Sequence, residues 1–152
     1  LQDTVPSWLY EVKAGGTSIW ERWDALRPDG TVNLGKDPGS GLVNAVGGGM
    51  VSFNHYANGA VGDWLYRRVA GLEAIEPGYK KFKVAPLVGG GLTSVSCFKK
   101  LSSGTIKINW NFENGVFVLS INVPFNTSAV ITLPDGKSLE VSSGKYVYSV
   151  EM

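Results

Sequence analysis

A carboxylate between two tryptophans is the feature of this sequence that points most directly to chemistry. Glu21 stands within Trp20-Glu21-Arg22-Trp23. Aromatic rings stack on the apolar faces of sugars, whereas carboxylates bind hydroxyl groups and transfer protons. A glycosidase needs two carboxyl groups across the scissile bond, so Glu21 would suit the general base, with Trp20 or Trp23 as a sugar platform. The alternative is a surface ion pair between Glu21 and an arginine such as Arg22, with both tryptophans in the core.

The single histidine is the second candidate for chemistry. His55 falls one turn inside an expected helix over residues 52–71, at the end that meets a glycine-rich loop. It could donate a hydrogen bond to a substrate hydroxyl or titrate near neutral pH. A structural role, with a hydrogen bond to a loop carbonyl, stays equally open.

Other motifs carry weaker signals. Cys97 is the only cysteine, which excludes an internal disulfide and a thiolate zinc site, and we interpret it as a small buried hydrophobe. One histidine excludes a multi-histidine metal site. Gly47-Gly48-Gly49 precedes a helix but lacks the Lys-Ser/Thr pair of a phosphate-binding loop, so we interpret it as a flexible connection.

The elements that must position these residues differ between the two halves of the chain. In the first half, Ser7 can cap a short helix over residues 7–15, and Gly15-Gly16 can end it. Residues 30–50 read as loop. A longer helix over residues 52–71 begins at Ser52, because apolar residues then recur at helical spacing.

In the second half the hydrophobic period changes to two, which is typical of strands. Expected strands cover residues 82–86, 94–101, 105–112, 116–123, 128–133, 138–141 and 146–150. The turn signal Asn114-Gly115 joins the third and fourth of them. This regular spacing predicts an antiparallel β-sandwich over residues 77–152, after a helical part over residues 1–76.

Charge and hydropathy exclude several classes of partner. The net charge is +1, with −3 in residues 1–76 and +4 in residues 77–152, which is too little to indicate nucleic-acid binding. No apolar run approaches the length of a membrane span. The sequence leaves a homo-oligomer open, and it leaves localisation open between the cytoplasm and the periplasm or extracellular space.

Two helices bury too little surface to offset the entropy of ordering them. They must therefore pack on the sandwich, on another copy, or on residues outside the 152 present. We expect the chain to be the C-terminal part of a larger protein.

Three segments together resemble one enzyme family. They are Pro6-Ser7-Trp8-Leu9-Tyr10, Gly16 to Asp24 with its Trp-Glu-Arg-Trp core, and Ser52 to Tyr66 with Phe53-Asn54-His55-Tyr56. In this order they resemble the C-terminal end of bacterial α-L-rhamnosidases, glycoside hydrolases with an (α/α)6-barrel catalytic domain. Pro77-Gly78-Tyr79 and the Gly89-Gly90-Gly91 stretch are similar to the junction between that barrel and a β-sandwich.

The resemblance implies an α+β fragment in which the terminal helices of an (α/α)6 barrel precede the sandwich. It implies an inverting hydrolase that releases terminal L-rhamnose, with Glu21 as general base and His55 in contact with the sugar. The general acid of the family lies far upstream of this chain. We therefore expect the isolated chain to be inactive, and the reaction to need no metal or organic cofactor.

Two questions stay open at this point. The glycine-rich stretch over residues 34–49 is longer than expected for the family and could shape the aglycone side of the cleft. The rivals are a glycosidase of the same plan acting on another sugar, and a non-catalytic carbohydrate-binding module built on the sandwich. The module would need exposed aromatic rings, whereas Trp110, Phe112 and Phe117 fall in core positions.

Overall fold

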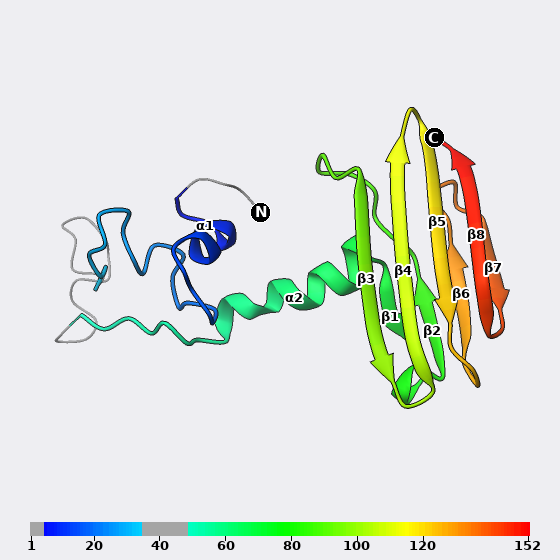
Figure 1. The fold of residues 1–152 in the computed structure, drawn as a ribbon, viewed down its shortest axis with the longest axis horizontal. Coiled ribbons are helices and arrows are strands. Elements are labelled where there is room, and N and C mark those ends of the chain that lie inside the picture. Colours follow the sequence, from blue (N-terminus) through cyan, green and yellow to red (C-terminus); the bar gives the residue numbers. More distant parts are fainter. Residues whose placement is uncertain (1–4, 35–48) are drawn as a thin grey trace. The chain divides into compact units, whose positions relative to one another are not determined.

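The computed structural model describes residues 5–34 and 49–152 of the chain (Figure 1). The chain forms two compact units, Leu1–Val61 and Gly62–Met152. The first holds a short helix and irregular segments, and the second holds all eight strands of the described residues. Helical segments followed by β-sheets are the architecture that the sequence predicted.

Helix α1 of the first unit covers Trp8–Lys13 and begins as predicted. Ser7 is its N-cap, with an Oγ atom that accepts a hydrogen bond of 3.0 Å from the backbone N–H of Tyr10. The helix ends where Gly15 takes the left-handed conformation, with φ of 85°. Capping and termination by these residues follow from local sequence chemistry alone.

The long helix begins later than predicted. A 3₁₀ turn over Ala57–Ala60 leads into α2, Val61–Trp64, and then into a π-helical turn over Leu65–Val69. Ser52 is therefore not its N-cap, and His55 lies before the helix. The physical reason is that main-chain groups of residues 52–55 bond across to residues 19–21, which leaves them unavailable for a helix.

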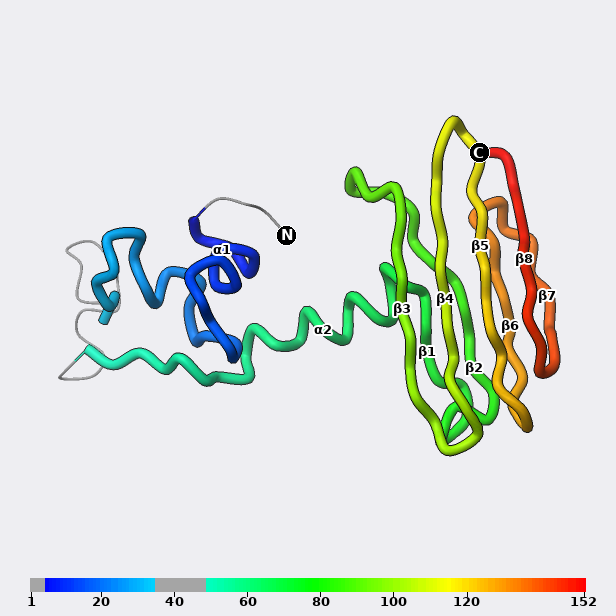
Figure 2. The backbone as a smooth tube through the Cα atoms, in the orientation of Figure 1, coloured from blue at the N-terminus to red at the C-terminus, as the bar shows by residue number. Residues whose placement is uncertain are grey.

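The second unit is a sandwich of two four-stranded sheets, with orders β1-β2-β6-β7 and β3-β4-β5-β8 (Figures 1 and 2). The strands are β1 Leu72–Ala74, β2 Lys81–Val84, β3 Ser94–Leu101, β4 Gly104–Glu113, β5 Val116–Val123, β6 Ser128–Thr132, β7 Ser138–Val141 and β8 Gly144–Glu151. A 3₁₀ turn over Pro77–Tyr79 joins the first two. The predicted strands over 94–101, 116–123 and 138–141 have the observed bounds.

Two features of the sheets differ from the prediction. The three-residue strand β1 was not predicted, because Leu72-Glu73-Ala74 is too short to show alternation. Its partner is β2, with Leu72 opposite Val84. The pair β2 and β6 is parallel, whereas the other strand pairs are antiparallel. The Asn114-Gly115 turn is confirmed, since both residues have the positive φ that a tight hairpin turn requires.

Alternating side chains of both sheets form the core of the sandwich. The fully buried residues include Phe82 and Val84 of β2, Ile106, Ile108 and Trp110 of β4, Phe117, Leu119 and Ile121 of β5, and Ala129 and Ile131 of β6. The Trp110 indole donates a hydrogen bond of 2.9 Å to the carbonyl of Val69, so the end of the helical segment is tied to the core. This bond satisfies a polar atom that burial would otherwise penalise.

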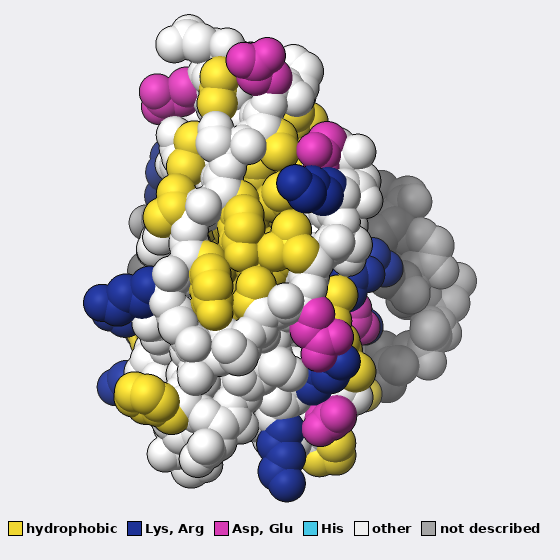
Figure 3. Space-filling view, turned by 90° about the vertical axis from the view of Figure 1, so that its right-hand side faces the viewer, with side chains coloured by type: hydrophobic (Ala, Val, Ile, Leu, Met, Phe, Trp, Pro, Cys, Tyr) yellow, Lys and Arg dark blue, Asp and Glu magenta, His cyan; other side chains and the backbone are white. Residues whose placement is uncertain are grey.

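Strands β7 and β8 are edge strands of the two sheets, and no further strand of the described residues covers the core on this side. Hydrophobic side chains gather in the middle of this face, with charged groups around them (Figure 3). Partly buried side chains that pack on the core from these strands are Leu139, Val141, Tyr146, Tyr148 and Val150. The rings of Tyr146 and Tyr148 are stacked, with centroids 6.3 Å apart.

Within residues 5–34 and 49–152, helices are too short or too polar for any to cross a membrane.

Replacing Gly71 by alanine should destabilise the sandwich strongly. Gly71 has φ of +80°, and a Cβ atom there would overlap the main chain of Ala85 and Pro86. Gly78 provides the control, because its φ is +70° but its surroundings are open. In urea unfolding of the chain followed by circular dichroism, Gly78→Ala should cost about 1–2 kcal/mol and Gly71→Ala about 3 kcal/mol or more. Equal costs would show that the close approach does not matter.

Candidate functional site

Glu21 is joined to Ser52 by two hydrogen bonds. The backbone N–H of Glu21 donates to the carbonyl of Ser52 over 2.9 Å, and the backbone N–H of Ser52 donates to Oε2 of Glu21 over 2.8 Å. The side chain of Glu21 is half-buried. One oxygen of its carboxylate is thus held in place by a main-chain donor.

His55 lies on the same segment as Ser52. Its backbone N–H donates to the carbonyl of Ile19 over 2.8 Å, two residues before Glu21. Its ring Nδ1 accepts a hydrogen bond of 3.2 Å from the backbone N–H of Ala57. The neutral ring therefore carries its proton on Nε2. The ring also stacks on Tyr56, with centroids 5.2 Å apart.

Asn58 was not singled out from the sequence. Its Nδ2 lies 3.3 Å from the carbonyl oxygens of both Trp20 and Glu21. Its own carbonyl accepts a hydrogen bond of 3.1 Å from the indole of Trp8. The residue lies two positions after the Phe-Asn-His-Tyr motif, and no sequence pattern marks it as functional. Its contacts with Trp20 and Glu21 are seen only in the folded chain.

Trp20 packs inside the first unit. Its side chain is 3% exposed, and its ring meets Phe53 edge-on at a centroid distance of 5.3 Å. A Cβ atom on Gly16 would lie 3.1 Å from the indole nitrogen, so glycine makes room for this ring. In this chain Trp20 therefore supports the main chain next to Glu21.

Trp23 is the more accessible tryptophan of the motif, with 36% of its surface exposed. Its ring meets Trp8 edge-on, with centroids 4.8 Å apart. The arginine between the two motif tryptophans pairs with Asp24, through bonds of 3.1 and 3.2 Å from Nε and Nη2 of Arg22. The partner of Arg22 is thus Asp24, whereas the alternative considered from the sequence paired an arginine with Glu21.

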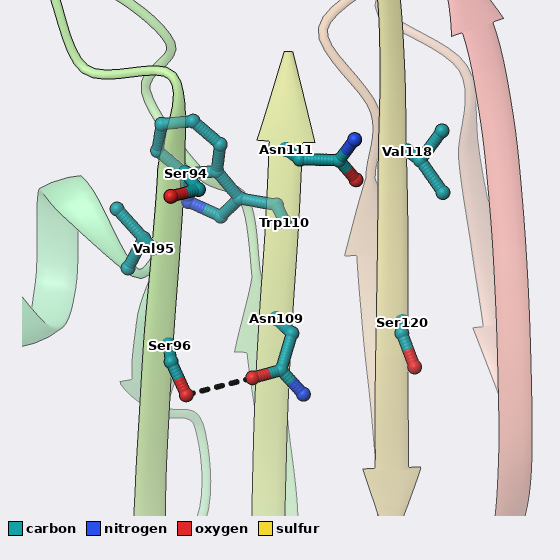
Figure 4. Close-up of a pocket in the computed structure, with 8 residues that line it drawn as sticks. All are labelled: Ser94, Val95, Ser96, Asn109, Trp110, Asn111, Val118 and Ser120. Carbon is teal, nitrogen blue, oxygen red and sulfur yellow. Dashed lines mark hydrogen bonds between the residues drawn. The ribbon is translucent and has the colours of Figure 1, made fainter. Parts of the chain in front are cut away.

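The outer face of the sandwich offers a different kind of surface. A cavity of about 300 Å³ lies over β3, β4 and β5 (Figure 4). Ser96, Asn109 and Ser120 share one register across it, and Ser96 donates 2.7 Å to Oδ1 of Asn109. The cavity is lined by Ser94, Val95, Ser96, Asn109, Trp110, Asn111, Val118 and Ser120. No lining residue is an acid or a base.

Burial places Trp110, Phe112 and Phe117 as predicted, although Phe98 of β3 is 60% exposed. Trp110 is 2% exposed and Phe117 is fully buried, while Phe112 packs partly buried against the core. These rings are unavailable for sugar stacking on the sandwich surface. Cys97 is half-buried, and burial raises the pKa of its thiol.

Groups of three or more acidic, histidine or cysteine side chains that could hold a metal ion are absent from residues 5–34 and 49–152. The glycine-rich stretch over residues 34–49, expected to shape the aglycone side, lies almost wholly outside the described residues.

Comparison with protein families accounts for both units. The family model for the bacterial α-L-rhamnosidase 6-hairpin glycosidase domain matches residues 1–69. The model for the bacterial α-L-rhamnosidase C-terminal domain matches residues 71–147, half of the chain. The chain belongs to the bacterial α-L-rhamnosidase family.

Individual relatives agree with this membership. The rhamnosidase chain is 37% identical to an α-L-rhamnosidase of Streptomyces avermitilis over 88% of its length, and 34% identical to one of Formosa agariphila over 95%. It spans only 12% and 14% of the length of these two relatives.

Solved structures give the same result. A native α-L-rhamnosidase from Aspergillus terreus is 39% identical, with a TM-score of 0.79 over 98% of this chain and 16% of that one. The Streptomyces avermitilis α-L-rhamnosidase, solved in complex with L-rhamnose, is 34% identical, with a TM-score of 0.77 over 99% of this chain and 15% of that one.

Replacing Asn58 by aspartate should loosen the segment that carries Glu21. The substitution puts a carboxylate oxygen against the carbonyl oxygens of Trp20 and Glu21 in place of the amide donor. We expect a loss of about 1–3 kcal/mol in the free energy of unfolding of the first unit, and faster amide exchange at residues 19–21. Urea unfolding and hydrogen exchange of the 152-residue chain measure both.

Asn54→Asp is the matched control, because Asn54 is exposed and bonds to the Ser52 hydroxyl through its main chain. If Asn58→Asp costs no more than Asn54→Asp, the amide of Asn58 does not hold the segment.

Proposed function

We propose that this chain supplies the general base and part of the sugar site of an α-L-rhamnosidase that releases terminal L-rhamnose with inversion. The observation that carries the proposal is the pair of bonds between Glu21 and Ser52, which fixes a carboxylate beside the segment of His55. Family membership supports the choice of sugar over the rival of another glycosidase on the same plan.

Glu21 would act in its ionised form. It takes a proton from a water molecule as the water oxygen attacks the anomeric carbon, and the bond from that carbon to the leaving oxygen breaks. A second carboxyl group protonates the leaving oxygen. In inverting enzymes the two groups stand about 6.5–9.5 Å apart, which leaves room for the water.

His55 and Trp23 would bind the sugar. Because Nδ1 of His55 accepts the N–H of Ala57, the Nε2–H is the group of this ring that can donate to a sugar hydroxyl. The exposed part of the Trp23 ring offers an apolar face for stacking. For Trp20, named with Trp23 as a platform from the sequence, burial favours a supporting role behind Glu21.

The general acid would come from the rest of the catalytic barrel. The chain spans only 12–16% of the length of its relatives, so most of such a barrel lies outside these residues. The substrate is then a rhamnose-containing glycoside. The partner of this chain is the remainder of the barrel. No step of this acid–base mechanism uses a metal or an organic cofactor.

Replacing Glu21 by glutamine in the full-length enzyme should lower kcat about 10²- to 10⁴-fold, because glutamine keeps the shape but cannot accept the proton. Hydrolysis of an aryl α-L-rhamnoside measures the effect, and proton NMR of the first product anomer tests for inversion. Glu76→Gln, at an exposed position of the second unit, is the control and should leave kcat unchanged. Full activity of the Glu21 variant would rule out its role as base.

The purified 152-residue chain should not hydrolyse the same aryl rhamnoside at a measurable rate. A base alone contributes about 10²- to 10⁴-fold, far less than glycoside hydrolysis requires. Turnover that Glu21→Gln abolishes would show instead that a second working carboxyl lies within these residues. Asp24 and Asp63 would be the first to test, although each pairs with an arginine.

A further inference from the structure

Glu11 is a buried carboxyl group that the proposed reaction does not use. Its side chain is 3% exposed on α1. The Oε2 atom accepts a hydrogen bond of 3.3 Å from the backbone N–H of Trp20. The Oε1 atom is buried and has no hydrogen-bond partner among the described residues. Burying a carboxyl group carries a free-energy cost, so its presence here calls for a function.

The bond to Trp20 completes the support of the segment before Glu21. The carbonyls of Ile19, Trp20 and Glu21, and the N–H of Glu21, all bond to residues 52–58. The N–H of Trp20 bonds instead to Glu11, on α1. Glu11 therefore holds the segment from a second element, at the Ile19–Trp20 peptide unit, one residue before the base.

We infer that Glu11 is a positioning residue for Glu21, acting through the main chain of Trp20. This inference rests on the proposed function of Glu21 as general base. A carboxylate base must hold the attacking water in line with the anomeric carbon, and a displacement of about 1 Å can cost about 100-fold in rate.

Helix α1 is anchored well enough to transmit this constraint. Ser7 caps its first turn, and the Tyr10 hydroxyl donates 2.9 Å to the carbonyl of Leu26. The Trp8 indole donates to the carbonyl of Asn58. After the helix, the N–H of Gly16 donates 2.9 Å to the carbonyl of Glu11 itself. Both the main chain and the side chain of Glu11 are thus fixed.

The environment of Glu11 favours its neutral form. Burial raises the pKa of the Glu11 carboxyl, and the bond from the Trp20 N–H lowers it by less. A neutral carboxyl still accepts the Trp20 N–H through its carbonyl oxygen. Glutamine reproduces this acceptor and places an NH₂ donor where the acid has its O–H, whereas methionine has similar length but no comparable acceptor.

The test compares Glu11→Met and Glu11→Gln in the full-length enzyme, with Glu76→Met as an exposed control. On an aryl α-L-rhamnoside we expect Glu11→Met to lower kcat about 10- to 100-fold with little change in KM. Glu11→Gln should recover most of the lost kcat, and the control should match the unsubstituted enzyme. An unchanged kcat for Glu11→Met overturns the inference.

A double-mutant cycle separates positioning from general structural support. If Glu11 acts through Glu21, then Glu11→Met should have little further effect on kcat in the Glu21→Gln background. Equal fold-losses in both backgrounds overturn the inference. If Glu11→Met fails to fold by circular dichroism, Glu11→Asp takes its place, because its carboxyl is one methylene too short to keep the bond to Trp20.

The outcomes also keep the two proposals apart. A Glu21→Gln enzyme with undiminished kcat refutes the proposed function. A large loss in Glu21→Gln together with full activity in Glu11→Met refutes only the positioning role.

Discussion

The crossing of residues 19–21 by residues 52–58 is the constraint on which the first unit depends. The two segments are more than thirty residues apart in the chain, and hydrogen bonds bring them together in place of a regular sheet or helix. Irregular backbone leaves polar groups that must find partners when they are buried. Here those partners lie on the other segment. The same hydrogen bonds that pair the buried backbone groups therefore also set the positions of Glu21 and His55.

The second unit depends on a different constraint, which is close packing between two sheets. Its core is built from alternating residues of neighbouring strands, and a single buried indole bond joins Trp110 to Val69 at the end of the helical segment. This sandwich contributes no acid or base to its outer cavity. Its stability is therefore a matter of apolar burial, whereas that of the first unit is a matter of hydrogen-bond geometry.

The sequence predicted most of the second unit and little of the detail of the first. Alternation of period two is a local signal, so strands such as Ser94–Leu101 and Ser138–Val141 were found with their bounds. The helix start at Ala57 was missed, because the N–H of His55 bonds to a residue far away in sequence. Asn58 and Glu11 were missed for the same reason: their roles depend on distant main-chain atoms, which no spacing or composition reveals.

The contacts that fix Glu21 to Ser52 use only backbone atoms of position 52. Side-chain replacement there changes neither the N–H that reaches the carboxylate nor the carbonyl that receives the N–H of Glu21. The Ser52 side chain bonds within its own segment, where its Oγ meets the main chain of Asn54. A replacement at this position therefore keeps both groups that reach Glu21. Proline is the exception, because it alone lacks the N–H. The side-chain type at position 52 therefore does not reveal the bonds to Glu21, whereas Asn58 and Glu11 support the same segment through their side chains.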